Sequence, residues 1–303
     1  MQTINEYFRY VGMDSRPMQE LDTCEVCNHH KFIVVRDTVL IKDKRRAPLR
    51  VCACTRCGFL SQLDRFDASF YDEYYAKNYR LCISDQLEPS DAFVENQIER
   101  GEHLYMNLAS ILPDSGVVLD VGSGPGGLLE IFHRHGWQVQ GIDPDEGAIE
   151  FGRRHFGFNL KSQSAETMEI ESNSLDLIVI TGSLEHVTDP NRVLQLCFDG
   201  LRVNGLIVIE GWALAQAQLL GGFGHNQKRY LTTKSISHLL IKHGFVMVRT
   251  FDFPICGPTR PHSICGIGRK KQGARYMANE DWPETMDFDH NQLMQRLDDL
   301  NIL

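Results

Sequence analysis

The feature that most constrains the fold is a glycine-rich turn between a short apolar strand and a helix. Residues 117–121 are apolar apart from one aspartate, Gly-Ser-Gly-Pro-Gly-Gly follows, and helical spacing then runs to about residue 135. Apolar strands and helical segments alternate from there to residue 269. Such alternation is typical of a parallel sheet covered by helices on both faces. We therefore predict an α/β, Rossmann-like fold with a sheet of about seven strands.

Four cysteines indicate a metal site ahead of this sheet. They form two matched pairs, Cys24-Glu-Val-Cys27 and Cys54-Thr-Arg-Cys57, within a short β-rich stretch that has no hydrophobic centre of its own. Two residues between cysteines let both thiolates of a pair face one ion, and four sulfurs complete a tetrahedral zinc shell. Such a shell leaves no open position for a catalytic water, so we predict a structural Zn²⁺ in a zinc-ribbon module.

Other interpretations of this stretch stay open. The cysteines could form a redox pair, and Cys52, His29 and His30 are nearby rival ligands. Between the pairs lies a basic stretch, residues 42–50, which is either a solvated hairpin tip or a grip on an anion of the substrate.

The glycine turn itself indicates a nucleotide-like ligand. Gly122, Gly124 and Gly126 let the backbone turn tightly and approach a ligand that side chains would exclude. Gly122, Gly124 and Gly127 also satisfy a dinucleotide-binding fingerprint. Asp120, at the end of the strand before the turn, would help organise a cationic, amino-acid-like ligand. Asp143 ends the next strand, where a carboxylate can accept both ribose hydroxyls.

In series, these residues resemble the class I S-adenosylmethionine-dependent methyltransferases over about residues 92–271. The resemblance implies a seven-stranded methyltransferase sheet with S-adenosyl-L-methionine as cofactor. It places the methionine part of the cofactor over Gly122, Ser123 and Gly124, and the adenine beside Pro144. By the same resemblance Ala165 and Glu166 line the adenine pocket, and the step Leu184-Glu185-His186 lies beside the cofactor and the acceptor.

The N-terminal part resembles proteins in which a zinc ribbon precedes the methyltransferase domain, including deoxysugar C-methyltransferases. In those proteins an aromatic stretch caps the pocket, which makes Tyr74, Tyr75 and Tyr79 lid candidates here. Proton removal from a hydroxyl acceptor needs a base, and histidine is the natural choice. We predict His225 as the first candidate base, with His186 and Glu185 as second candidates. His225 is followed by Asn226 and Gln227 rather than by the family's Glu-His, which favours transfer to oxygen over carbon.

The sequence therefore predicts a methyltransferase acting on a hydroxyl of a small molecule, such as a nucleotide-linked sugar, glycan or natural-product intermediate. The chain has 31 basic and 40 acidic residues, a formal net charge of -9, which argues against nucleic acid as a partner. Two alternatives are an RNA methyltransferase that uses the zinc ribbon, and a non-catalytic cofactor-binding scaffold. Nine cysteines in this arrangement and the lack of an apolar span predict a cytoplasmic protein. The oligomeric state is left open.

We expect four regions along the chain. They are a zinc-ribbon module with its lead-in (1–65), a helical linker and lid (66–112), the cofactor-binding domain (113–272), and a tail with a last helix at 290–300 (273–303).

Overall fold

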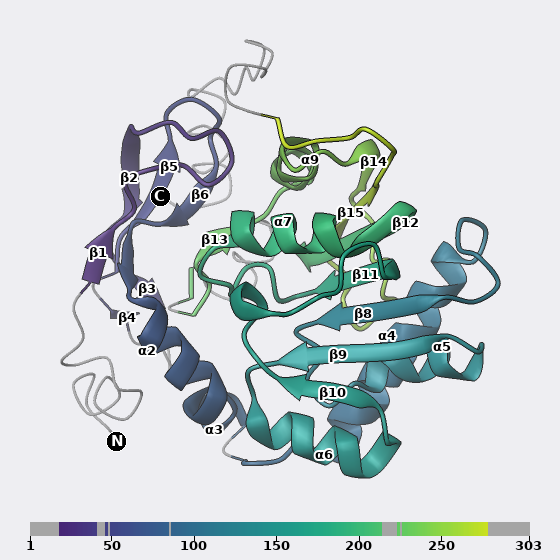
Figure 1. The fold of residues 1–303 in the computed structure, drawn as a ribbon. Helices are drawn as coiled ribbons and strands as arrows, with labels where there is room; N and C mark the ends of the chain where they lie inside the picture. The colour runs from purple at the N-terminus through teal and green to yellow at the C-terminus, as the bar shows by residue number, and fades with distance from the viewer. Residues whose placement is uncertain are drawn as a thin grey trace.

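A computed structural model of the chain describes residues 18–40, 46–47, 49–84, 86–213, 223–224 and 226–277. The last helix expected at 290–300 lies outside the described residues, and so does His225. The described part consists of a large α/β unit and a smaller β module that are joined by helices α2 and α3 (Figure 1).

The main sheet has the seven strands that the sequence predicts. Their order across the sheet is β10 (Asn159–Ser162), β9 (Gln138–Asp143), β8 (Val117–Val121), β11 (Leu175–Thr181), β12 (Leu201–Trp212), β15 (Ser263–Arg269) and β14 (Val246–Phe251).

The prediction of a wholly parallel sheet is wrong at one edge. The pairs from β10 to β12 are parallel, but β15 pairs antiparallel with both β12 and β14. Residues 252–262 contain no helix, and a parallel return would need a longer crossover connection, usually helical.

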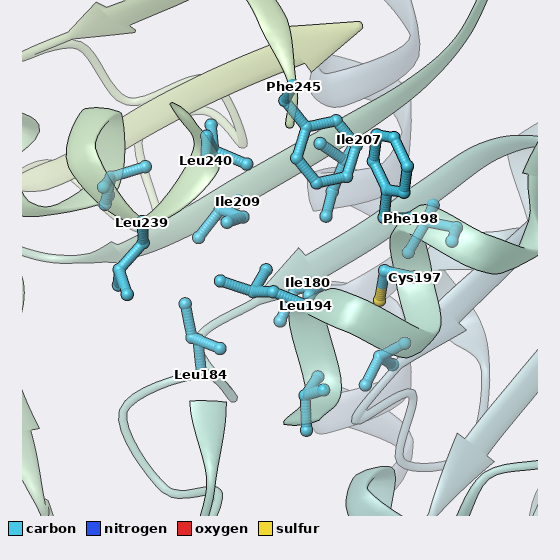
Figure 2. Close-up of a cluster of buried hydrophobic side chains, with 14 of the residues drawn as sticks. Ile180, Leu184, Leu194, Cys197, Phe198, Ile207, Ile209, Leu239, Leu240 and Phe245 are labelled. Carbon is cyan, nitrogen blue, oxygen red and sulfur yellow. The ribbon is translucent and has the colours of Figure 1, made fainter. Parts of the chain in front are cut away.

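Helices cover both faces of the sheet, as expected. Alternate residues of the central strands point to opposite faces, so Leu177 and Val179 lie on one side and Ile178 and Ile180 on the other. The first side packs against α4 (Asp91–Leu108), α5 (Glu130–Arg134) and α6 (Glu146–Phe156). The second side packs against α7 (Pro190–Gly200) and α9 (Thr233–Lys242), in the cluster drawn in Figure 2.

The small module contains three sheets. A four-stranded sheet has the order β13 (Arg229–Tyr230), β6 (Leu60–Gln62), β5 (Val51–Cys54) and β2 (Phe32–Arg36). β1 (Met18–Glu20) pairs with β7 (Asp64–Phe66), and β3 (Val39–Leu40) pairs with β4 (Arg46–Ala47). β13 comes from the chain that follows β12 of the main sheet, so the two units share a sheet.

Aromatic side chains fill the core between the module and the connecting helices. α2 (Ala68–Glu73), the π-helix Tyr74–Asn78 and α3 (Tyr79–Ser84) leave the module and run toward the main sheet. Phe70, Tyr71 and Tyr74 pack there with Val51 and Tyr230. The module thus draws its hydrophobic core from outside its own sequence, as a stretch without a core of its own must.

Candidate active site

A cavity of about 250 Å³ opens at the carboxyl edge of the sheet. It lies between the ends of β8, β9 and β11, where Gly122, Asp143 and Gly182 line it. β8 and β11 are neighbours in the sheet but not in the chain, so this is the topological switch point. Ligands of open α/β sheets bind at such a point.

The glycine turn forms one wall of the cavity. Gly122, Gly124 and Gly126 have φ values of 85, 53 and 85°, which L side chains rarely adopt. A Cβ on Gly122 would lie 2.4 Å from the Cβ of Ser183. The amides of Gly122 and Ser123 donate to the Ile142 carbonyl, which fixes the turn against the end of β9. Its shape leaves bare backbone facing the cavity.

Helix α4 ties this turn from the other side. The Gln97 amide nitrogen donates to the Ser123 carbonyl (3.2 Å), and the Gly127 amide donates to the Gln97 side-chain oxygen (3.2 Å). Phe93 and Arg100 share that helix face and also line the cavity. The sequence analysis missed these residues, although their spacing of four and three residues on one helix could have revealed them.

Asp143 lies at the end of β9 with its carboxylate fixed. Oδ2 accepts the Gly124 amide (2.8 Å) and Oδ1 accepts the Asp145 amide (2.8 Å). Burial raises the pKa of Asp143 to about 6. The remaining lone pairs of both oxygens are available to hydroxyl donors in the cavity.

The structure brings most of the predicted cofactor residues to the cavity, but not all of them. Those that line it are Gly122, Gly124, Asp143, Pro144, Ala165 and Glu166. Those that lie behind its wall are Asp120, Ser123, Gly126 and Leu184. Asp120 is 2% exposed, and burial raises its pKa to about 7.

Of the candidate bases, only His186 is placed in the cavity among the described residues. Its Nδ1 lies 2.8 Å from the Asn226 carbonyl, which can only accept, so Nδ1 carries the hydrogen and Nε2 keeps its lone pair. Burial lowers the pKa of His186 to about 4, so the ring is neutral at physiological pH. Glu185 is fully buried behind the wall, where its Oε1 accepts the Trp212 amide.

Two arginines with unpartnered nitrogens also line the cavity, and the sequence analysis missed both. Arg260 donates from Nε to Glu210 (2.8 Å), while its buried Nη2 has no partner. Its guanidinium lies over Gly182, where a Cβ would meet Nη2 at 2.6 Å. The Nε of Arg100 is likewise unpartnered. Arg260 comes from the irregular connection between β14 and β15, which carries no motif that could have identified it.

Two of the three lid candidates line the cavity, and the third lies in the core of the module. Tyr75 and Tyr79 line the cavity, with their rings 6.1 and 6.5 Å from the ring of His186. The Tyr75 hydroxyl donates to the Asn226 carbonyl that His186 also uses. Tyr74 is 2% exposed and stacks on Phe70 in the core of the module.

The four cysteines come together as the sequence predicts. The Sγ atoms of Cys24, Cys27, Cys54 and Cys57 all lie within 4.8 Å of one another. Two of the pairs, Cys24 with Cys57 and Cys27 with Cys54, are 3.6 Å apart. A tetrahedral zinc with bonds of about 2.3 Å would place its sulfurs about 3.8 Å apart, so this cluster could hold zinc.

The rival ligands face elsewhere. The Cys52 sulfur approaches the Ser61 hydroxyl (3.8 Å), His29 pairs with the Thr55 hydroxyl (3.0 Å), and His30 contacts the Asp22 carbonyl (3.0 Å). Of the basic stretch, Arg50 is engaged by Glu20 and Asp64. Residues 41–45 lie outside the described part of the chain.

Known proteins match the part of the chain that forms this site. A family described as a methyltransferase domain matches residues 119–209. The ubiquinone biosynthesis O-methyltransferase of Coxiella burnetii is 35% identical over 85 residues, covering 26% of this chain and 36% of that protein. An uncharacterized methyltransferase of Mycobacterium sp. (strain KMS) is 27% identical over 159 residues, covering 50% and 61%. The chain thus spans less than two thirds of the length of each of these relatives.

A solved structure shows the same fold. A chain of the complex between the Haloferax volcanii Trm112 methyltransferase activator and a methyltransferase superposes with a TM-score of 0.50 at 11% identity, covering 60% of this chain and 95% of that one. Sheet order, glycine cradle and family match together define a class I S-adenosylmethionine-dependent methyltransferase domain. This chain carries such a domain behind an N-terminal four-cysteine cluster. No helix in the described ranges is long and apolar enough to cross a bilayer.

Proposed function

We propose that the chain transfers a methyl group from S-adenosylmethionine to a hydroxyl oxygen of a small molecule, of the sugar, glycan or natural-product type. The observation that carries this proposal is the cradle at the switch point. Bare backbone at Gly122 and Gly124 faces a cavity whose next wall is the fixed carboxylate of Asp143. The Coxiella relative, an O-methyltransferase by name, supports transfer to oxygen.

The residues around the cavity fit this cofactor. The Asp143 lone pairs would accept the ribose hydroxyls, with Pro144 and Ala165 beside the adenine. The unpartnered nitrogens of Arg100 and Arg260 suit the carboxylate of the methionine part, because a buried N–H donor without an acceptor is costly. When bound, the cofactor supplies a methyl group on a positively charged sulfur.

His186 is the base that we propose on the acceptor side. Its neutral ring presents the Nε2 lone pair to the cavity and is held by the Asn226 carbonyl. It would take the proton from an acceptor hydroxyl as that oxygen attacks. Tyr75 and Tyr79 would enclose the acceptor and exclude water. His225 lies outside the described residues and stays a prediction, and a structural Zn²⁺ at the four cysteines is part of the proposal.

Labelled cofactor tests the activity directly. We expect the full chain to transfer radiolabelled methyl groups from S-adenosylmethionine to at least one member of a panel of sugar nucleotides, phenols and glycan fragments. Calorimetry should show binding of S-adenosylhomocysteine. A chain that binds S-adenosylhomocysteine but labels only RNA would refute the small-molecule proposal.

Replacing His186 by alanine should separate binding from turnover. General bases contribute about 10²–10⁴-fold to rate. We expect the labelling rate of His186→Ala to fall at least 100-fold, with S-adenosylhomocysteine affinity within threefold of wild type. The same measurement on His225→Ala compares the two candidates. Unchanged turnover in His186→Ala with a loss in His225→Ala would reassign the base.

Cofactor affinity should depend on pH through Asp143. Its pKa in the free protein is raised to about 6, and only the carboxylate form accepts both ribose hydroxyls. Affinity for S-adenosylhomocysteine should therefore be constant above pH 7 and fall below pH 6, by up to about tenfold per pH unit. Calorimetry from pH 5 to 8 measures this. Asp143→Asn should bind weakly without that step, and a step that persists in it would assign the titration to another group.

A further inference from the structure

The segment that carries His186 is held by side chains rather than by a sheet. Residues 184–188 follow β11, and His186, Val187 and Thr188 line the cavity. The Arg229 Nη1 donates to the carbonyls of Leu184 (2.6 Å) and Val187 (2.7 Å). The Lys228 amine donates to the carbonyl of His186. The backbone of this cavity wall is therefore held by Lys228 and by Arg229 of strand β13, while Glu166 accepts the Thr188 amide.

The Arg229 side chain also pairs with a residue that lies between two cysteines of the cluster. Its Nε and Nη2 donate to the two carboxylate oxygens of Glu25, at 2.9 and 2.7 Å. Glu25 lies in the sequence between Cys24 and Cys27. The Arg229 side chain is 0% exposed and that of Glu25 is 6% exposed. Each charged group therefore has the other, rather than water, as its partner. Arg65 donates to the same carboxylate (2.5 Å).

The backbone of Glu25 is also anchored to the large unit. Its carbonyl accepts the Lys242 amine of α9 (2.9 Å) and the Asn191 amide of α7 (3.0 Å). A displacement of the cluster would therefore also move the Glu25 carboxylate that pairs with Arg229. Removing one partner of a buried ion pair is strongly destabilising, because a charge is left without compensation.

We propose that Glu25 is a positioning residue, which sets the cavity wall 184–188 through Arg229 and thereby couples the four-cysteine cluster to cofactor binding. Glu25 is not among the residues that line the cavity, so it acts on the cofactor only through that wall. The binding part of this inference rests on the proposed function. By this proposal the module supports the wall of the active site and is more than an appended domain.

Hydrogen exchange and calorimetry on the full chain test the coupling. In Glu25→Gln we expect amide exchange in a peptide spanning 182–190 to rise at least tenfold, while the strands at 117–121 and 175–180 exchange as in wild type. S-adenosylhomocysteine affinity should fall at least tenfold. Glu20→Gln is the matched control, since Glu20 pairs with Arg50 in the same module but is exposed and remote from the wall. It should leave both readouts unchanged.

Arg229→Lys keeps the inference testable if Glu25→Gln does not fold. Lysine keeps the charge beside Glu25, but its single nitrogen cannot occupy the three positions from which Nε, Nη1 and Nη2 of Arg229 donate. We expect a folded protein that retains its zinc, exchanges faster at 182–190 and binds S-adenosylhomocysteine at least tenfold more weakly. Wild-type exchange and affinity in either folded variant would overturn the coupling. If wild type itself does not bind S-adenosylhomocysteine, the proposed function fails, and the exchange readout still decides the coupling.

Discussion

Replacing Asp143 by alanine is expected to weaken S-adenosylhomocysteine binding by at least 100-fold. Hydrogen bonds to a charged group contribute about 1.5–3 kcal/mol each, so two ribose contacts amount to about 3 kcal/mol or more, a factor above 100 in the dissociation constant. The carboxylate also holds the amides of Gly124 and Asp145, so its loss releases the adjacent glycine turn. Calorimetry at pH 8, where Asp143 is ionised, measures the effect.

The matched control is Glu150→Gln. Glu150 is an exposed carboxylate on α6, the helix that follows Asp143, and it pairs only with surface arginines among the described contacts. It should bind S-adenosylhomocysteine like wild type. Asp143→Ala with wild-type affinity and an unchanged melting temperature would remove Asp143 from the ribose contact and leave the glycine turn as the only support for the cofactor assignment.

Loss of the metal site should destabilise both units of the protein. We expect Cys54→Ser to lose bound zinc and to melt about 10 °C or more below wild type, because binding of a structural zinc contributes directly to folding. The effect should extend beyond the module, since β13 pairs with β6 next to the cluster and Glu25 compensates Arg229. Zinc content by a colorimetric chelator and thermal unfolding by fluorescence are the measurements.

Cys52→Ala separates this effect from the loss of any buried cysteine. Cys52 is fully buried on the same strand as Cys54, but its sulfur lies against Ser61 and outside the cluster. We expect it to retain one zinc per chain and to melt near wild type. Equal metal content in Cys54→Ser and wild type would show that the four cysteines do not form the site.

The fold was predictable wherever local pattern and chain order are enough. Alternation of apolar strands with helical segments predicted a sheet of about seven strands, and the main sheet has seven. The errors lie where pairing partners matter. A strand has the same sequence signature whether its neighbour is parallel or antiparallel, so the reversal at β15 could not be seen.

The candidate site was likewise predictable only in part. Gly122, Gly124 and Asp143 were found because a tight turn and a strand-end acid follow each other within one β-turn-α-β unit. Arg260 was missed because it reaches the cavity from a distant segment that carries no motif, and Gln97 and Arg100 were missed although their spacing places them on one helix face. Leu184 and Glu185 lie beside His186 in the chain, yet only His186 lines the cavity, since successive residues of a turn point in different directions.

The sequence by itself determined the alternation of strands and helices in the central unit, the cysteine pairs and the glycine cradle, because each depends on residues that are near one another in the chain. Only the tertiary structure decided how the module meets the domain. Glu25 and Arg229 are 204 residues apart in the chain, and no sequence pattern links them. The cysteine motif that contains Glu25 requires no glutamate there, so the pairing follows from burial: a buried charge needs a partner, and which partner is present depends on how the whole chain folds.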